Sequence, residues 1–200
     1  MSTLFDSFNG ETDYGCGAEL SPDGLYRYTL TREWDDGRCV AWLMFNPSTA
    51  DADQDDATIR KCVGFSKFWG YGRLVVVNLF AIRSRDPKSV ARVVDPIGPL
   101  NDYWIKEATS ECREVVCAWG CSEHIPPKFA GRINHVTDLI PEHVPTVCLG
   151  RRNDGSPRHP LILAYKTERV PYFRETEAKW CPDCTPDGTC QRHAVAGVPA

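Results

Sequence analysis

Two asparagines stand at the ends of two apolar runs, and both have side chains suited to pairing with a planar heterocycle. Asn46 follows "CVAWLMF", and Asn78 follows "RLVVV". An amide side chain offers one acceptor and two donors, which can pair with the edge of a nucleobase. The alternative is that each asparagine caps a turn, as asparagine often does. The sequence leaves both interpretations open.

The segment "LMFNPSTADADQDDATIRKC" changes from apolar to acidic after Asn46. It holds Ser48 and four aspartates, Asp51, Asp53, Asp55 and Asp56. Asp55 or Asp56 can cap the helix that follows, because negative charge is favourable there. Asp51 and Asp53 are candidates to orient water or nearby arginines. A bound Mg²⁺ is a third use, since that ion prefers carboxylates together with phosphate and water.

A basic segment, "GRRNDGSPRHPLIL", contains Arg151, Arg152, Arg158 and His159. Arginine is suited to phosphate, and a histidine at the rim of a pocket can donate a hydrogen bond to a developing anion or shuttle a proton. The alternative is a solvated loop with a structural histidine. The formal net charge of the 200-residue chain is −4. Any surface that binds DNA must therefore be local, and this segment is the candidate.

The length predicts one domain over residues 25–170, preceded by a loose lead-in over 1–24 and followed by a tail over 171–200. No run of about 20 apolar residues is present and the N-terminus lacks the pattern of a signal peptide, so we expect a cytoplasmic protein without a membrane span. Ten cysteines are present. Cys39, Cys117 and Cys148 lie in apolar segments and are predicted to be reduced core thiols.

Strand-like and helix-like segments alternate along this domain. Two strand-like runs flank Asp36-Gly37, which is typical of a hairpin. A helix is predicted over "ATIRKCVGFSKFWG", with Gly70 as its stop, and a buried strand over "RLVVVNLFA". A helix over about 99–112 then leads to the strand "EVVCAWG", and a helix over "PPKFAGRINHVTDLI" leads to "TVCLG". The pattern predicts a three-layer α/β/α domain with a four-stranded parallel central sheet.

The ligand of an open parallel sheet binds outside the carboxyl ends of its strands. Those ends are here Asn46-Pro47-Ser48, Asn78, Trp119-Gly120 and Gly150-Arg151. We therefore expect Asn46, Ser48, Asn78, Trp119 and His159 to surround one pocket, with the three arginines of the basic segment close to a phosphate.

The C-terminal segment "CPDCTPDGTCQRH" spaces Cys181, Cys184, Cys190 and His193 as C-x2-C-x5-C-x2-H. Three thiolates and one imidazole complete a tetrahedral shell, so the spacing favours a small structural Zn²⁺ knuckle. The alternative is a tail in which the cysteines are coincidental.

Several ordered motifs identify a close relationship. "NPSTADADQDDATIRKC", "FWGYGRLVVVNLFAIRSRDP", "IGPLND", "VVCAWG" and "GSPRHPLIL" resemble the uncharacterised bacterial and phage family catalogued as domain of unknown function 1643. The resemblance runs from about Tyr26 to Leu163. It implies no activity.

At longer range, the order of the strand-end motifs is similar to the uracil-DNA glycosylase superfamily, with matches at Asn46-Pro47, Asn78, Trp119-Gly120 and His159-Pro160. That resemblance implies a glycosylase-like fold in which Asn78 reads the base, His159 donates a hydrogen bond to a base oxygen and Asn46 holds water. Phe45, Phe80 or Trp119 would stack on the base.

Two departures from this superfamily affect the chemistry. Asn46 stands where the most active branch has an aspartate, and an amide cannot act as a general base, so hydrolysis would be slower or would rely on Asp51 or Asp53. Leu161 follows His159-Pro160 where that superfamily has serine in the loop that grips DNA.

The expected function is cleavage of the N-glycosidic bond of a pyrimidine in DNA. An alternative is a phage-type enzyme of base hypermodification that displaces pyrophosphate from an activated pyrimidine, with Mg²⁺. A further alternative is a non-catalytic module that binds nucleic acid or a nucleotide.

Overall fold

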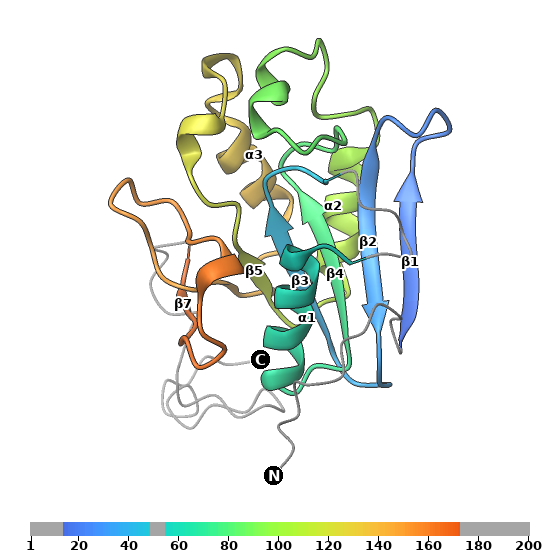
Figure 1. The fold of residues 1–200 in the computed structure, drawn as a ribbon, viewed down its shortest axis with the longest axis vertical. Helices are drawn as coiled ribbons and strands as arrows, with labels where there is room; N and C mark the ends of the chain where they lie inside the picture. Colours follow the sequence, from blue (N-terminus) through green and yellow to red (C-terminus); the bar gives the residue numbers. More distant parts are fainter. Residues whose placement is uncertain (1–13, 49–54, 173–200) are drawn as a thin grey trace, which may run out of the picture.

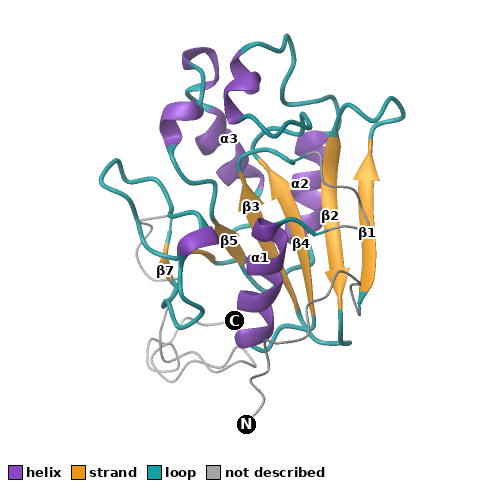
Figure 2. Cartoon of the chain, in the orientation of Figure 1, coloured by secondary structure: helices purple, strands orange, loops and turns teal. Residues whose placement is uncertain are grey.

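The computed structural model describes residues 14–48 and 55–172, which form one sheet with helices on both faces (Figures 1 and 2). The strands are β1 (Gly15–Leu20), β2 (Arg27–Glu33), β3 (Cys39–Met44), β4 (Arg73–Asn78), β5 (Val115–Cys117), β6 (Thr146–Cys148) and β7 (Val170–Pro171). The α-helices are α1 (Ala57–Phe68), α2 (Asn101–Ser110) and α3 (Arg132–Leu139). Four short 3₁₀ turns among the described residues are η1 (Pro87–Ala91), η2 (Ser122–His124), η3 (Pro127–Phe129) and η4 (Pro160–Ile162).

The strand order in the sheet is β1-β2-β4-β3-β5-β6-β7. The central strands β4, β3, β5 and β6 pair in parallel, whereas β1 and β2 on one side and β7 on the other pair antiparallel. The expectation of a sheet with only four parallel strands is therefore corrected to a mixed seven-stranded sheet. The apolar parallel strands were readable because both of their faces are buried. The added edge strands β1 and β7 are mostly exposed and carry no such signal.

The hairpin expected at Asp36-Gly37 is wrong. Strand β4 lies between β2 and β3 and pairs with both of them. The connection between β2 and β3 instead packs on the start of β4, where the backbone N–H groups of Trp34 and Asp35 donate to the carbonyl oxygen of Gly72. A Cβ atom on Gly72 would lie 2.4 Å from the backbone nitrogen of Gly37, so the two backbones touch at this point. The Asp-Gly turn therefore bridges a neighbouring strand.

The sheet also begins earlier than the sequence indicated. Strand β1 lies within the expected lead-in and pairs with β2 from Gly15↔Glu33 to Leu20↔Arg27. Its residues, "GCGAEL", are short or polar and mostly exposed, which is typical of a strand at the edge of a sheet.

Helix α1 covers one face of the sheet, and α2 and α3 cover the other (Figure 1). Each face has its own apolar cluster: Trp42 and Phe65 belong to the α1 side, and Ile105 and Val136 to the other. Asp56 caps α1, because its side chain accepts from the backbone N–H of Ile59. The expected layers and the expected cap are both present, and they fix where α1 begins.

The remaining helices are shorter than expected. Helix α2 falls inside the predicted 99–112 segment, and the segment 126–140 divides into η3 and α3.

Cys117 and Cys148 are buried free thiols, and Cys39 is half-buried with its sulfur 3.1 Å from that of Cys112. No helix in residues 14–48 and 55–172 has the length and apolar character to cross a membrane.

Candidate functional site

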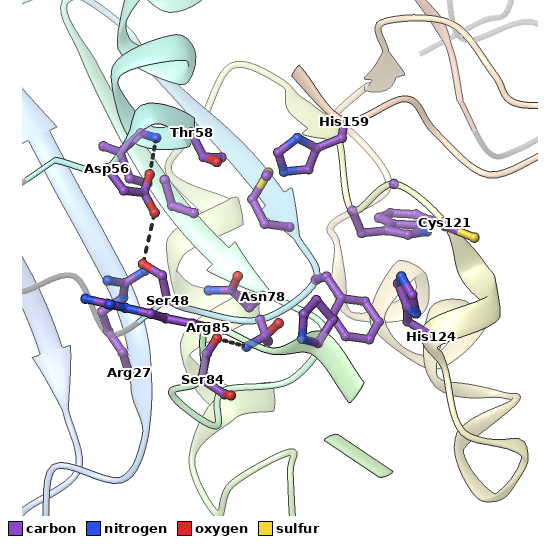
Figure 3. Close-up of a pocket in the computed structure, with 18 residues that line it drawn as sticks. Arg27, Ser48, Asp56, Thr58, Asn78, Ser84, Arg85, Cys121, His124 and His159 are labelled. Carbon is purple, nitrogen blue, oxygen red and sulfur yellow. Dashed lines mark hydrogen bonds between the residues drawn. The ribbon is translucent and has the colours of Figure 1, made fainter. Parts of the chain in front are cut away.

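A cavity of about 330 Å³ opens at the carboxyl ends of β3 and β4, beside the first turn of α1 (Figure 3). Its walls bring together five residues that the sequence analysis selected: Asn46, Ser48, Asn78, Trp119 and His159. They come from the ends of three strands and from the loop that leads to η4. The rule for strand ends in parallel sheets therefore locates the cavity.

Asn78 lies at the floor of the cavity and is 2% exposed. Its Nδ2 atom has no hydrogen-bond partner among the described residues. The backbone behind it is fixed, since Nδ2 of Asn101 donates to the Asn78 carbonyl at 3.1 Å and Nε of Arg132 donates to the Leu79 carbonyl at 2.7 Å. A buried donor without an acceptor costs about 1–3 kcal/mol. A ligand that brings an acceptor to this amide would recover that cost.

The second strand-end asparagine is used differently. Nδ2 of Asn46 donates to the carbonyl oxygens of Ser84 at 2.8 Å, Pro47 at 3.1 Å and Ile82 at 3.4 Å. The amide nitrogen therefore ties the loop after β3 to the segment after β4. Asn46 borders the cavity, but its donor group is occupied by the protein itself.

His159 caps η4, and its Nδ1 accepts from the backbone N–H of Leu161 at 3.4 Å. The proton of the neutral ring is then carried by Nε2. Burial lowers the pKa of His159 below its ordinary value of 6.5, and the negative charge of Asp56 opposes that effect. The histidine is therefore a neutral N–H donor at neutral pH.

Two neighbouring aspartates have separate roles at the start of α1. Asp55 forms a buried ion pair with Arg32, at 2.8 Å, and accepts from the hydroxyl of Tyr14. Asp56 faces the cavity: its Oδ1 accepts from the Ile59 N–H at 2.8 Å, and its Oδ2 accepts from the Ser48 hydroxyl at 2.9 Å. Figure 3 shows the bond to Ser48 along the cavity wall.

Several residues of the cavity were not predicted from the sequence. Arg27 of β2, which is 3% exposed, and the exposed Arg85 place guanidinium groups on the side of Ser48 (Figure 3). Cys121 and His124 line the opposite side. An arginine inside the apolar run "LYRYTL" was a usable signal, because arginine is rarely buried without a reason. The short segment 121–124 carried none.

Aromatic rings supply the apolar part of the wall. Phe45 and Trp119 border the cavity and are almost wholly buried. Phe80, the third ring expected to stack, packs behind Phe45 with ring centroids 5.3 Å apart and does not reach the cavity. The walls therefore combine two flat apolar surfaces with a few polar groups, as small-molecule sites commonly do.

The arginines of the basic segment do not line the cavity. Arg151, Arg152 and Arg158 are exposed on the loop between β6 and η4. Cζ of Arg151 lies 4.9 Å from the centroid of the Tyr172 ring, and Nε of Arg152 lies 3.8 Å from Oδ1 of Asp154. These three arginines, called the basic rim below, lie on the loop that leads to His159.

Some selected residues fall outside the described residues. These are Asp51, Asp53, Cys181, Cys184, Cys190 and His193. Within residues 14–48 and 55–172, no three His, Cys, Asp or Glu side chains gather in a way that could hold a metal ion. The predictions of Zn²⁺ and Mg²⁺ therefore rest on the sequence.

Fold and cavity together define a mixed α/β protein with a candidate ligand pocket at the carboxyl ends of its parallel strands. The chain belongs to the family described as "Protein of unknown function (DUF1643)", whose profile matches residues 27–161. No curated protein matches the chain, and no solved structure matches it either. The similarity to glycosylases thus rests on the order of the strand-end motifs.

Proposed function

We propose that this protein binds a pyrimidine of DNA, turned out of the base stack, in the cavity and cleaves its N-glycosidic bond. The observation that carries the proposal is Asn78, a buried residue of the cavity wall whose Nδ2 donor has no hydrogen-bond partner among the described residues. Enzymes that act on a base must bring it out of the stack into such a pocket.

The donors of the pocket favour a base that presents oxygens. Asn78 offers an N–H at the floor, and the neutral His159 offers its Nε2–H from the side. A pyrimidine with two carbonyl groups supplies an acceptor to each of these donors. Phe45 and Trp119 provide the apolar surface that such a ring needs.

His159 also suits the departure of the base. When the glycosidic bond breaks, negative charge develops on the base, and a preorganised neutral N–H donor stabilises an oxyanion without a prior loss of its own proton. Burial lowers the pKa of His159, so that the ring is neutral under physiological conditions. Removing one donor of this kind from an active site costs about 10²–10³-fold in rate.

A second candidate function is displacement of pyrophosphate from an activated pyrimidine. The guanidinium groups of Arg27 and Arg85 at the cavity favour a substrate that carries an anion there. Such a reaction would use Mg²⁺, for which the acidic segment that follows Ser48 is the expected site.

The test is a mass-spectrometric assay of the purified full chain on short single- and double-stranded DNA. The oligonucleotides carry uracil, 5-hydroxymethyluracil or phosphorylated 5-hydroxymethyluracil, each with and without Mg²⁺. Release of free base supports the proposed cleavage. Loss of phosphate with the base still attached, only in the presence of metal, would support the second candidate. Binding without any change would leave a non-catalytic module.

Two histidine variants make the assay specific to the pocket. His159→Ala is expected to slow base release by about 10²–10³-fold. His143→Ala removes an exposed histidine that does not line the cavity and should release base at the normal rate. Equal rates for both variants would contradict the role of His159.

A further inference from the structure

Asp56 caps helix α1, and its carboxylate also lies on the wall of the cavity. Among the described residues that line the cavity, only Asp56 carries a carboxyl group. It lies on the wall that joins the loop after β3 to α1, and Figure 3 places it across Thr58 from His159.

Hydrogen bonds hold this carboxylate in a fixed orientation. One oxygen accepts from the Ile59 N–H at 2.8 Å, and the other accepts from the Ser48 hydroxyl at 2.9 Å. An ionised carboxylate has about four acceptor positions, so these two bonds leave roughly two for a ligand or a water molecule. A helix N-cap needs only one of them.

Asn46 cannot replace this group. Its amide nitrogen donates to three backbone carbonyls, and an amide does not take up a proton at neutral pH. Asp55 is excluded by its buried ion pair with Arg32 and is absent from the cavity wall. In the proposed complex, Asn78 and His159 donate hydrogen bonds to the base and stabilise its negative charge. The positive charge on the sugar therefore needs a different residue.

We propose that Asp56 is the catalytic carboxylate of this pocket, which holds the attacking water through its free acceptor positions and faces the positive charge that develops on the sugar. This inference rests on the proposed cleavage of a glycosidic bond. Ser48 is a positioning residue, because its hydroxyl orients the carboxylate.

The step balances with groups that the pocket and the solvent supply. The bond between the sugar C1′ and the base nitrogen breaks, and both electrons leave on the base. A water oxygen forms the new bond to C1′, and its proton passes to Asp56. The base anion, stabilised by Nε2–H of His159, takes a proton from solvent, and Asp56 returns its proton to solvent.

The substitution Asp56→Asn removes the negative charge of the side chain but keeps its ability to cap α1. Asparagine is as good an N-cap as aspartate, and its amide can still pair with Ser48. The melting temperature should therefore stay close to that of the original protein, while single-turnover base release falls by about 10²–10⁴-fold. Asp95→Asn is the matched control, because Asp95 is an exposed aspartate that accepts from two backbone N–H groups away from the cavity.

A binding measurement tests the charge independently of turnover. DNA with a cationic pyrrolidine in place of the deoxyribose mimics the charged sugar, and DNA with a neutral tetrahydrofuran is its uncharged counterpart. The original protein and Asp95→Asn should bind the cationic DNA at least about tenfold more tightly than the neutral DNA, which corresponds to 1.4 kcal/mol. Asp56→Asn should lose this preference.

The outcomes separate the two proposals. An unchanged preference and rate in Asp56→Asn would overturn the role of Asp56 while base cleavage stands. The role of Asp56 would also be overturned if Asp51→Asn or Asp53→Asn lost the tighter binding of the cationic DNA while Asp56→Asn kept it. If the original protein neither releases base nor binds either DNA, the proposed function itself fails, and the inference fails with it.

Discussion

At the carboxyl ends of β3 and β4, two asparagines lie on neighbouring strands in similar sequence settings. The amide of Asn46 donates to three carbonyl oxygens of the loops around it, whereas Nδ2 of Asn78 has no partner in the part of the chain that the structure describes. The first asparagine holds the rim of the pocket together, and the second leaves a donor for a ligand.

The difference follows from the position of each residue relative to the end of its strand. Asn78 is the last residue of β4 and pairs in register with Met44, so its backbone is fixed in the sheet and its side chain stands at the pocket floor. Asn46 lies two residues beyond the end of β3, where loop carbonyls are within reach of its amide. Of two identical residue types, the one inside the strand is the better candidate to bind a ligand.

The largest expected effect comes from removing the donor at the floor. Asn78→Ala should slow base release by about 10²–10³-fold, because a hydrogen bond to the base oxygen is lost in the transition state. Its stability should change little, because the substitution removes the cost of burying an Nδ2 donor that has no partner in the described part of the protein, and it also removes packing of the side chain. Single-turnover kinetics and thermal melting measure the two quantities separately.

The exposed Asn134 of α3 provides the control for this variant, and Asn134→Ala should leave both rate and stability unchanged. A variant Asn78→Ala that keeps its full rate would remove the distinction between the two asparagines.

Asn46→Ala should show the opposite pattern. Three carbonyl oxygens lose their shared donor, which is expected to cost about 1–3 kcal/mol of the free energy of unfolding. Chemical denaturation measures that loss. Base release should fall less than in Asn78→Ala, because the substitution affects the pocket only indirectly, by loosening the loops that Asn46 holds together.

Asn46→Asp sharpens the same point. This substitution introduces the aspartate of the most active glycosylase branch, yet it places a carboxylate oxygen against the carbonyls of Ser84 and Pro47. It should destabilise the protein without raising the rate. A faster Asn46→Asp variant would show that Asn46, rather than Asp56, occupies the water-holding position.

Much of the layout was predictable because its signals are local. The apolar runs that end at Met44, Asn78, Cys117 and Cys148 are the four parallel strands, and the ends of the first three border the cavity. The cap at Asp56 was also readable, since an aspartate before a helical pattern is a common N-cap.

Other features depend on contacts between distant segments. The amide of Asn46 is occupied by the carbonyl oxygens of Ile82 and Ser84, which lie 36 and 38 residues further along the chain. A local sequence pattern does not show that such distant residues are in contact. Arg27 reaches the cavity because β2 pairs with β4, a pairing that the apparent hairpin concealed. The polar edge strand β1 was hidden for a different reason, since it buries no apolar face.

A smaller effect is expected from pH, through His159. Burial lowers the pKa of His159 below 6.5, its value in an unfolded chain. Below pH 6.5 the unfolded state binds more protons than the folded state, so this contribution to stability is present above that pH and is lost as the pH falls. Thermal melts between about pH 5 and 8 should show His159→Gln gaining stability relative to the original protein on the acid side.

His143→Gln, at an exposed histidine, should follow the original protein throughout the series. Parallel curves for all three proteins would mean that the pKa of His159 is unshifted. Base release should level off as the pH rises towards neutral, because the lowered pKa of His159 leaves most of its rings neutral there.

The smallest effects are expected at the basic rim, and they test whether it acts on phosphate rather than on the base. Arg152→Ala and Arg158→Ala each remove one exposed guanidinium group from the loop that leads to His159, outside the cavity lining. Each should weaken DNA binding uniformly across sequences and reduce the slope of log affinity against log salt by about one. Fluorescence anisotropy over a range of salt concentrations measures that slope. The rate at saturating DNA should be unchanged, in contrast to Asn78→Ala, because a phosphate contact positions the strand without touching the bond that breaks. If either arginine variant instead lowered the rate at saturating DNA and left the salt slope unaltered, the basic rim would contribute to the bond-breaking step. The functional site would then extend beyond the strand ends that define the pocket.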